Sequence, residues 1–560
     1  MHGYSFICSF VAIKHHYNIV KSLLQMKTTN TTIIILVITS LFVSCTKDID
    51  NWYNSYDDIY GNNSSNTPGN MGGSTGNLSD FNVAIDSTSL AEDETIPSDD
   101  KDYVENFKTT KNIEIKYSNS SVSVNGDVAG VSIQTNGADV TVTSTTEKVN
   151  YILSGSTTDG SFKMAESEDN KKFKLTLDGV SINNNDGPAI NIQVGKRCYV
   201  VANNGTYNSF SDGTAYAESE EDQKGTFFSE GELLFSGKGH IKVNANAKAG
   251  IVSDDYIMIR PNTNIYVKAT AGNGIKANDG IDVRGGVVNV EATANAAKGI
   301  KSDGYYTQSG GRVIAIVTGK AEYDSEERDY KGAKGLKADS LLTIDGGKLI
   351  IVSSGGSECE GIESKSKLVI NDGEVQSFAY DDAINSSDDM SINGGSVFAY
   401  SIGNDGLDAN GNLYIKGGLV YAIGSSSPEL AIDANTEGGK KLYVTGGTII
   451  AIGGLEGGAS LSQSCYATST WSKSKWYALK YGDKTLAFQT PSGGGSTLVV
   501  SAASYPTLLS DVTVSSGNKI FSSAVYTDAT ISGGSNVSLS SYSGSSMGSG
   551  GFPGGGGWGS

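Results

Sequence analysis

The sequence contains little proline, little histidine and few positive charges. Only 8 of its 560 residues are proline, whereas 71 are glycine. No segment repeats its apolar residues at a helical interval, so the composition favours strands joined by turns. The formal net charge of −19 disfavours nucleic acid as a partner, because phosphate binding needs a basic surface. It suits cations, or a polymer that cations bridge.

Residues 26–45 have the features of a secretion signal. Met26 and Lys27 give a short polar start, and the apolar run that follows is too short to span a bilayer. The segment ends in Leu-Phe-Val-Ser-Cys, which matches the cleavage box of bacterial lipoproteins except at the phenylalanine. We predict that translation starts at Met26, that 1–45 is the precursor segment, and that Cys45 carries the lipid. The alternative is an ordinary signal peptide with a cysteine there by chance.

Removal of the precursor segment leaves few side chains for familiar catalytic or zinc centres. His240 is the one histidine of the predicted mature chain. A single histidine is a poor basis for a Ser-His-Asp triad or a histidine-rich zinc site. Cys198, Cys359 and Cys465 are three scattered thiols and do not form a disulfide framework.

Composition divides the mature chain into four parts. Residues 46–105 are rich in small polar residues, and we predict a disordered tether. Residues 106–458 contain short alternating segments and, in their second half, regular repeats. Residues 459–542 are expected to form a small β module that caps the open end of the repeats. Residues 543–560 form a Gly-rich tail.

Two markers recur in fixed register through the repeats. The first is a small residue followed by Ile or Leu, at intervals of 22 to 26 residues with one of 36: Gly250, Gly274, Gly299, Gly335, Gly361, Ala383, Gly406 and Ala431. The second is usually Gly-Gly and begins 11 residues later: Gly285, Gly310, Gly346, Asp372, Gly394 and Gly417. The long interval holds a charged insert over about 320–334, which we expect to be a loop at one corner.

Apolar residues between the markers form columns with an alternating period, and this pattern determines the fold class. Seven, nine and fourteen residues after Gly274 lie Ile281, Val283 and Val288, and the five repeats from Gly299 to Gly406 have apolar residues at the same places except at Gln308. Each repeat therefore has three strands with one inward face. Stacked repeats pair as parallel strands. The sequence predicts an all-β protein, a parallel β-helix with three strands per coil.

Acidic residues gather at one corner of the predicted coil. In a β-helix, residues one repeat apart are neighbours about 4.8 Å apart. The residues that stack in this way are Glu360, Glu363, Asp381, Asp382, Asn385, Asp405, Asp408 and Asp433. Like charges repel at this distance, and hard oxygen ligands without histidine or thiolate are typical of Ca²⁺ sites. We predict a calcium site here. The alternatives are that the acids point into water, or that some stay protonated.

The column that contains Glu363 is basic in the preceding repeats, where it holds Lys276, Lys301 and Lys337. These lysines are candidates for binding the carboxylates of an acidic sugar chain that lies along the coil axis. The alternative is a solvated row of salt bridges with nearby aspartates, each of which contributes little to stability.

Two aromatic residues, Phe398 and Tyr421, lie on the outward phase of the last strand of their repeats. Exposed aromatic rings can stack on sugar rings, so they are candidates for carbohydrate binding. The alternative is that the C-terminal module covers them.

The chain resembles a bacterial carbohydrate-binding β-helix family that includes a clostridial binder of polygalacturonate and cellulose. The segments that resemble it are Leu-Thr-Leu-Asp-Gly-Val-Ser-Ile at 175–182, Gly-Pro-Ala-Ile at 187–190, Asn-Ser-Phe-Ser-Asp-Gly at 208–213, and the acidic motifs at 360–363, 381–385 and 404–408. The resemblance implies a right-handed parallel β-helix, bound calcium and binding of acidic polysaccharide. Ala383, Asn404, Asn273 and Lys298 depart from the family pattern.

The function favoured by these features is non-catalytic, calcium-dependent binding of acidic polysaccharide. We expect a lipid-anchored monomer at the outer membrane, facing the cell surface, with no other membrane contact and no nucleic-acid partner. One alternative is a pectate-type lyase, since the resemblance extends to a fold in which calcium acidifies the sugar and a lysine abstracts the proton. Another is a structural adhesin without a specific sugar ligand. Fold alone does not choose among them.

Overall fold

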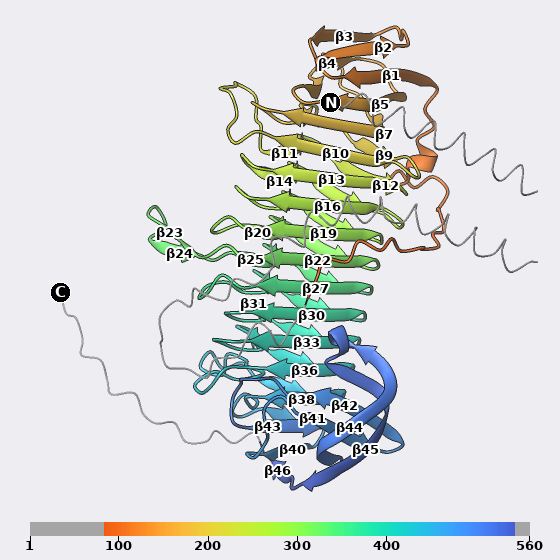
Figure 1. The fold of residues 1–560 in the computed structure, drawn as a ribbon. Helices are drawn as coiled ribbons and strands as arrows, with labels where there is room; N and C mark the ends of the chain where they lie inside the picture. The colour runs from red at the N-terminus through yellow and green to blue at the C-terminus, as the bar shows by residue number, and fades with distance from the viewer. Residues whose placement is uncertain (1–82, 544–560) are drawn as a thin grey trace, which may run out of the picture. The chain divides into compact units, whose positions relative to one another are not determined.

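The computed structural model describes residues 83–543, and this part of the chain forms a parallel β-helix followed by a small antiparallel module (Figure 1). Apart from two short 3₁₀ turns, η3 (Val104–Asn106) and η4 (Phe521–Ser523), its regular structure is all β. Each regular coil has three strands, and their stacking produces three ladders that are parallel except at the N-terminal end, so the predicted fold class is confirmed. Within the described residues, no helix is long and apolar enough to cross a membrane.

The three ladders have these bounds. The first ladder is formed by β3 (Val131–Asn136), β4 (Asp139–Ser144), β6 (Ser161–Ala165), β8 (Ile190–Ile192), β11 (Gly225–Ser229), β14 (Ala249–Ser253), β17 (Ile275–Ala277), β20 (Lys298–Ser302), β25 (Lys334–Ala338), β28 (Ile362–Ser364), β31 (Ile384–Ser386) and β34 (Leu407–Ala409). The second is formed by β9 (Cys198–Ala202), β12 (Leu233–Gly237), β15 (Tyr256–Ile259), β18 (Gly280–Val283), β21 (Tyr305–Gln308), β26 (Leu342–Ile344), β29 (Leu368–Ile370), β32 (Met390–Ile392), β35 (Leu413–Ile415), β37 (Leu442–Val444) and β39 (Ser460–Leu461). The third is formed by β10 (Tyr207–Asp212), β13 (His240–Ala245), β16 (Asn264–Ala269), β19 (Val287–Ala292), β22 (Arg312–Val317), β27 (Lys348–Ser353), β30 (Glu374–Ala379), β33 (Ser396–Ser401), β36 (Leu419–Ile423) and β38 (Thr448–Ile452).

The first coils are less regular than the rest. Long strands replace the separate second and third strands: β1 (Lys111–Ser118), β5 (Val149–Thr157) and β7 (Phe173–Asn184). They pair with one another in parallel. The first half of β7 then pairs with β9, and its second half pairs with β10. The antiparallel strand β2 (Ser121–Asn125) pairs with β1 at the N-terminal end of the stack. These early turns therefore belong to the same β-helix.

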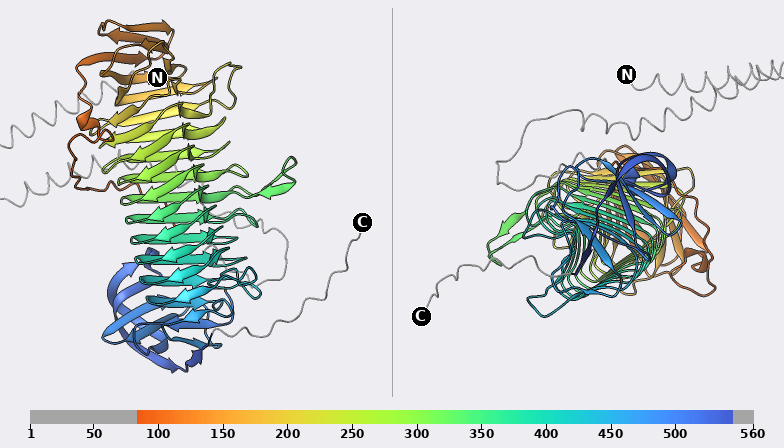
Figure 2. Two further views of the ribbon diagram at one scale, coloured as in Figure 1. Left: turned by 180° about the vertical axis from the view of Figure 1, so that it is seen from behind. Right: turned by 90° about the horizontal axis from the view of Figure 1, so that it is seen from below.

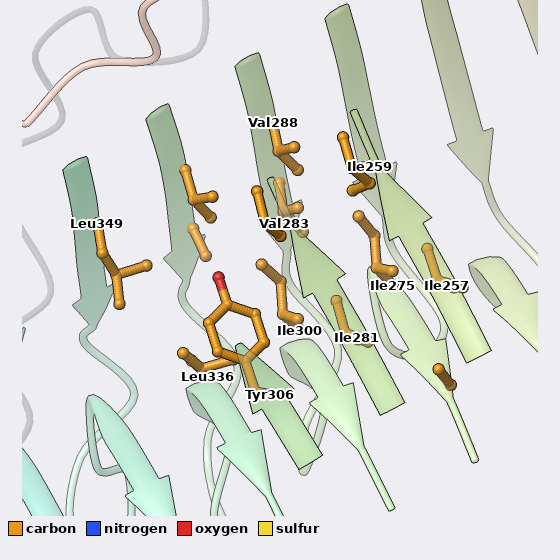
Figure 3. Close-up of a cluster of buried hydrophobic side chains, with 14 of the residues drawn as sticks. Ile257, Ile259, Ile275, Ile281, Val283, Val288, Ile300, Tyr306, Leu336 and Leu349 are labelled. Carbon is orange, nitrogen blue, oxygen red and sulfur yellow. The ribbon is translucent and has the colours of Figure 1, made fainter. Parts of the chain in front are cut away.

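The interior is filled by the apolar columns seen in the sequence. Ile275, Ile281 and Val288 point inward from the three strands of one coil, and each is at most 1% exposed (Figure 3). Burial of a side chain of this size contributes roughly 1.5–3 kcal/mol. Gln308 interrupts the pattern but is buried and satisfied, because its Oε1 accepts the Tyr306 hydroxyl at 3.0 Å and its Nε2 donates to the Gly310 carbonyl at 3.2 Å.

The two glycine markers have separate physical causes. At Gly274 a Cβ atom would lie 2.2 Å from Cγ1 of Val290 and 2.5 Å from the Gly299 carbonyl oxygen. The first marker is therefore small because the first and third strands of a coil pack closely. Gly286, the second glycine of a Gly-Gly pair, has φ +81°, which favours glycine at the turn before the third strand.

Residues 83–105, which lie within the predicted tether, run along the outside of the second and third ladders. Arg260 forms ion pairs with Glu94 at 2.6 Å and Glu105 at 2.7 Å, and Arg312 pairs with Asp86 at 3.1 Å. This segment therefore packs on the coil. The predicted precursor segment, Cys45, the rest of the tether and the tail beyond residue 543 lie outside the described residues.

The C-terminal module closes the end of the β-helix and covers part of its side. Its strands are β40 (Cys465–Thr468), β43 (Leu498–Ser501), β46 (Ser540–Tyr542) and a closed barrel of β41 (Trp476–Tyr481), β42 (Lys484–Gln489), β45 (Val525–Val537) and β44 (Thr507–Ile520). Strand β43 pairs antiparallel with β38, the last strand of the third ladder. The tip of the β44–β45 hairpin reaches back along the coil, where the Phe521 N–H donates to Glu374 at 3.0 Å.

The charged insert is a loop at one corner, as predicted. It contains a short antiparallel hairpin of β23 (Glu322–Asp324) and β24 (Asp329–Lys331). The hairpin projects sideways from the middle of the stack, at the corner that precedes the strands of the first ladder (Figure 2). At its base, the Ala296 N–H donates to the Lys320 carbonyl at 2.8 Å.

Candidate functional site

The outer face of the first ladder carries two columns of charged side chains. The corner column lies just before each strand or at its first residue: Lys298, Lys334, Glu360, Asp382 and Asp405. The strand column lies in register on the strands themselves: Lys276, Lys301, Lys337, Glu363, Asn385 and Asp408. Both columns change from basic to acidic between β25 and β28. The face therefore has a basic half and an acidic half, which meet at one coil boundary.

Lysines balance the first two acids after this boundary. Lys334 forms ion pairs with Glu360 and, at 3.0 Å, with Glu363. Lys365 lies 2.5 Å from Glu363. Burial alone raises the pKa of Glu363, but Lys334, Lys365 and Lys337 outweigh it and lower the pKa of this carboxyl. Glu360 and Glu363, which the sequence analysis placed in the metal site, thus have cationic partners within the chain, so we leave them out of the candidate site.

Three acids of the following coils come together without such partners. One carboxylate oxygen each of Asp405, Asp408 and Asp433 lies within 4.8 Å of the others. Across residues 83–543, no lysine or arginine lies within ion-pair distance of any of the three. Burial is the main cause that raises the pKa of Asp405 to about 9, of Asp408 to about 7 and of Asp433 to about 8. The neighbouring carboxylates add to this effect.

Asp381, Asp382 and Asn385 surround these three acids. The Asn385 amide donates to Asp382 at 3.0 Å and to Asp408 at 2.7 Å. Asp382 is 6% exposed, and its Oδ1 accepts the Asp405 N–H at 3.0 Å. Asp381 accepts the Asn404 amide at 2.7 Å. Asn385 therefore orients the Asp408 carboxylate, and Asp382 holds the backbone of Asp405.

The donor set fits a hard divalent cation. Three carboxylates in reach of one another, without histidine or thiolate, are the ligand type that Ca²⁺ prefers. A cation of charge +2 would counter the burial and the mutual repulsion that together hold the pKa values of Asp405, Asp408 and Asp433 above their usual range. The residues present therefore fit the predicted calcium at this corner.

The pH dependence of stability follows from the same carboxyls. In the unfolded chain they titrate near pH 4, whereas in the folded chain the three pKa values are about 7 to 9. The folded state binds more protons between these limits, so this contribution to stability is complete below about pH 4 and is lost as the pH rises to about 9. We expect Tm in a chelating buffer to fall between pH 5 and 9. A Tm that rises over this range in calorimetry would contradict the assignment.

The three predicted sugar-binding lysines form ion pairs along the basic half. Lys276 and Lys301 share Asp303, at 3.0 and 2.6 Å. Lys337 lies 3.1 Å from Asp339 and 3.8 Å from Glu363. These contacts correspond to the salt-bridged row that the sequence left open as the alternative.

Phe398 and Tyr421 are not available to a sugar, which corrects the first interpretation of these residues. Phe398 is 2% exposed and Tyr421 is 0% exposed. The ring of Tyr421 lies 5.6 Å from that of Phe488, and its hydroxyl donates to the Gln489 carbonyl at 2.8 Å. The C-terminal module therefore covers both rings. The alternation of their strands could not show this, because the covering strands come from a distant part of the sequence.

Sequence reasoning missed a second acidic cluster on the first-ladder side. Asp222, Glu230 and Asp254 bring carboxylate oxygens within 4.8 Å of one another. Lys224 pairs with Asp254 at 2.5 Å and with Asp222 at 2.9 Å, so this cluster already has a cation. Glu230 also borders a polar cavity of about 510 Å³.

Comparisons with known proteins give one similar family and one similar solved structure. No curated protein matches the chain. One solved structure is similar, and it is described as the polysaccharide lyase-like protein from C. thermocellum in a gadolinium derivative. The two sequences are 25% identical, and the aligned part covers 54% of the present chain and 96% of the chain in that structure. Its TM-score of 0.35 is too low to compare the sites. Over residues 136–406, just under half of its length, the chain is similar to the family described as carbohydrate-binding domain-containing protein.

Proposed function

We propose that this protein binds acidic polysaccharide without cleaving it, and that calcium held by Asp405, Asp408 and Asp433 links the protein to the glycan. The observation that carries the proposal is the cluster of these three carboxylates, within 4.8 Å of one another on the outer face of a β-helix. The similarity of residues 136–406 to a carbohydrate-binding family supports the same ligand class.

Calcium accepts six to eight oxygen ligands. If bound here, it would supply positive charge between the protein's carboxylates and those of a uronic-acid polymer. Asp405 is 8% exposed and forms the inner side of the cluster, whereas Asp408 and Asp433 are partly exposed. The two outer acids would therefore hold the ion where a sugar carboxylate can complete its coordination.

The proposal includes a location at the bacterial cell surface, through a lipid on Cys45. Its support is the lipoprotein-like box at the end of residues 26–45. A diacyl-plus-amide lipid anchors a protein stably where one acyl chain would not.

The lyase alternative needs a lysine that can accept a proton beside the calcium. Lys276, Lys301 and Lys337 are each held by carboxylates. Lys298 comes nearest to the requirement, since burial, helped by the ammonium groups of Lys337, Lys334 and Lys301, lowers its pKa to about 8. An ultraviolet assay for unsaturated uronate tests this directly. Calcium-dependent product release from pectate would overturn the non-catalytic proposal.

Affinity electrophoresis tests binding itself. The wild-type protein should be retarded in gels that contain polygalacturonate, and retardation should increase with Ca²⁺ and fall when a chelator is added. Alginate and a neutral glucan serve as comparison polymers. Equal mobility in all gels, with and without Ca²⁺, would favour the adhesin without a specific sugar ligand.

A further inference from the structure

The basic half of the charged face contains one lysine without a carboxylate partner. Among residues 83–543, every other lysine of the two columns lies within 4.0 Å of an Asp or Glu. The Lys298 ammonium instead donates to the Ala296 carbonyl at 2.6 Å, and no described carboxylate lies within ion-pair distance. An ammonium has three N–H donors, so Lys298 retains donors for an anion from outside the chain.

The surroundings of Lys298 have an excess of positive charge. Six lysines lie in this part of the face (Lys276, Lys298, Lys301, Lys334, Lys337 and Lys365), but their ion pairs involve only four carboxylates (Asp303, Asp339, Glu360 and Glu363). Burial lowers the pKa of Lys298 to about 8, and the ammonium groups of Lys337, Lys334 and Lys301 add to this effect. An anion bound here would relieve the repulsion among these groups.

Two exposed tyrosines lie on the hairpin that projects from the same corner of the coil. Tyr323 and Tyr330 face each other across the β23–β24 hairpin, with ring centroids 5.2 Å apart. They are 52% and 57% exposed. The base of the hairpin is hydrogen-bonded to the segment just before Lys298, where the Lys320 N–H donates to Asn295 at 3.1 Å.

Two ion pairs and the aromatic pair join the strands of the hairpin. Lys331 pairs with Asp324 at 2.5 Å and with Glu327 at 2.9 Å. A two-stranded hairpin is only marginally stable alone, and a cross-strand aromatic pair contributes at most about 1 kcal/mol. The two rings offer a small, open aromatic surface on a projecting arm. Tyrosine supplies an apolar ring face with a polar tip, which suits a sugar ring.

We propose that Lys298 and the Tyr323–Tyr330 hairpin form a second, calcium-independent subsite for a carboxylate-bearing sugar. The Lys298 ammonium donates to a sugar carboxylate, and a tyrosine ring of the projecting hairpin packs against another sugar ring of the same polymer. The subsite rests on the proposed binding of acidic glycan but uses a different mode of contact. The basic half of the face binds carboxylates directly, whereas the acidic half binds them through calcium. One polymer along the coil axis can engage both halves.

Affinity electrophoresis in polygalacturonate gels that contain a chelator tests the subsite. We expect the wild-type protein to remain retarded there, and methyl-esterified pectin, which lacks the charge, to abolish this retardation. Lys298→Met should weaken the chelator-resistant binding about tenfold or more, since a hydrogen bond to a charged group is lost. Lys298→Arg should retain it. Tyr323→Ala combined with Tyr330→Ala should also weaken it.

Two control variants separate this inference from the calcium site. Lys238 is an exposed lysine just before β13, a strand of the third ladder. Lys238→Met removes the same charge and should leave chelator-resistant binding unchanged. Asp408→Asn with Asp433→Asn should remove only the calcium-dependent part. Calorimetric Tm values check that each variant is folded. The subsite is overturned if the wild-type protein is not retarded in chelator, or if folded Lys298→Met binds as the wild type does. Failure of calcium to strengthen binding would count against the calcium site alone.

Discussion

Replacing Asp408 and Asp433 together by asparagine should abolish the stabilisation of the protein by Ca²⁺ and, in chelator at pH 8, make it more stable than the wild type. Both effects come from the same cluster, in which carboxylate oxygens lie within 4.8 Å of one another without a cationic partner in residues 83–543. Asparagine removes the charge but keeps the size. The wild type should gain about 2.7 kcal/mol when free Ca²⁺ is 100 times its Kd, and the variant should gain almost none.

Calorimetry at pH 8, with and without Ca²⁺, measures both effects in one series. The matched control is Asp388→Asn with Asp389→Asn, which removes the same charge at the next corner of the coil, outside the cluster. This control should respond to Ca²⁺ as the wild type does. A double variant at Asp408 and Asp433 that still gains stability from Ca²⁺ would show that the ion binds elsewhere.

Replacing Phe398 by alanine should destabilise the protein by about 3–5 kcal/mol, as is usual for a buried phenylalanine, and leave its affinity for glycan unchanged. The ring is 2% exposed and lies 5.5 Å from the ring of Phe521 and 5.0 Å from that of Tyr421. Its loss leaves a cavity between the third ladder and the C-terminal module. Denaturant unfolding measures the first effect.

Binding of folded Phe398→Ala to polygalacturonate, measured well below its Tm, distinguishes a packing residue from a sugar-binding one. Ile350→Ala serves as a comparison, since Ile350 occupies the same outward column two coils earlier and is 5% exposed. Loss of affinity in folded Phe398→Ala without loss of stability would restore a sugar-stacking role for this ring.

Most of the fold could be predicted from the sequence because its determinants are local and repeated. The column of Ile281 and Tyr306 and the Gly-Gly turns recur in each coil, and stacking converts a sequence interval into a spatial neighbour. Gln308 looked like an exception, but its hydrogen bonds satisfy it inside the core. The contacts of residues 83–105 with Arg260 and Arg312 could not be predicted, since they join segments more than 150 residues apart.

The candidate site could be predicted only in part, because charge balance depends on rotamers and on partners in other columns. The repeat interval placed Asp405, Asp408 and Asp433 together. It did not show that Lys334 forms an ion pair with Glu360, since Lys334 belongs to the corner column and the regular lysine spacing is that of the strand column. In the sequence, Lys298 stands out only as a departure from the family pattern. That it lacks a carboxylate partner is a property of the folded coil.

The position of the calcium ion and its contact with the sugar can be measured directly by anomalous diffraction from crystals grown with Ca²⁺ and an oligogalacturonate. We predict a calcium peak between Asp405, Asp408 and Asp433, with a sugar carboxylate among its ligands. No peak at these three residues at saturating Ca²⁺, or a peak beside Glu360 and Glu363 with Lys334 displaced, would contradict it.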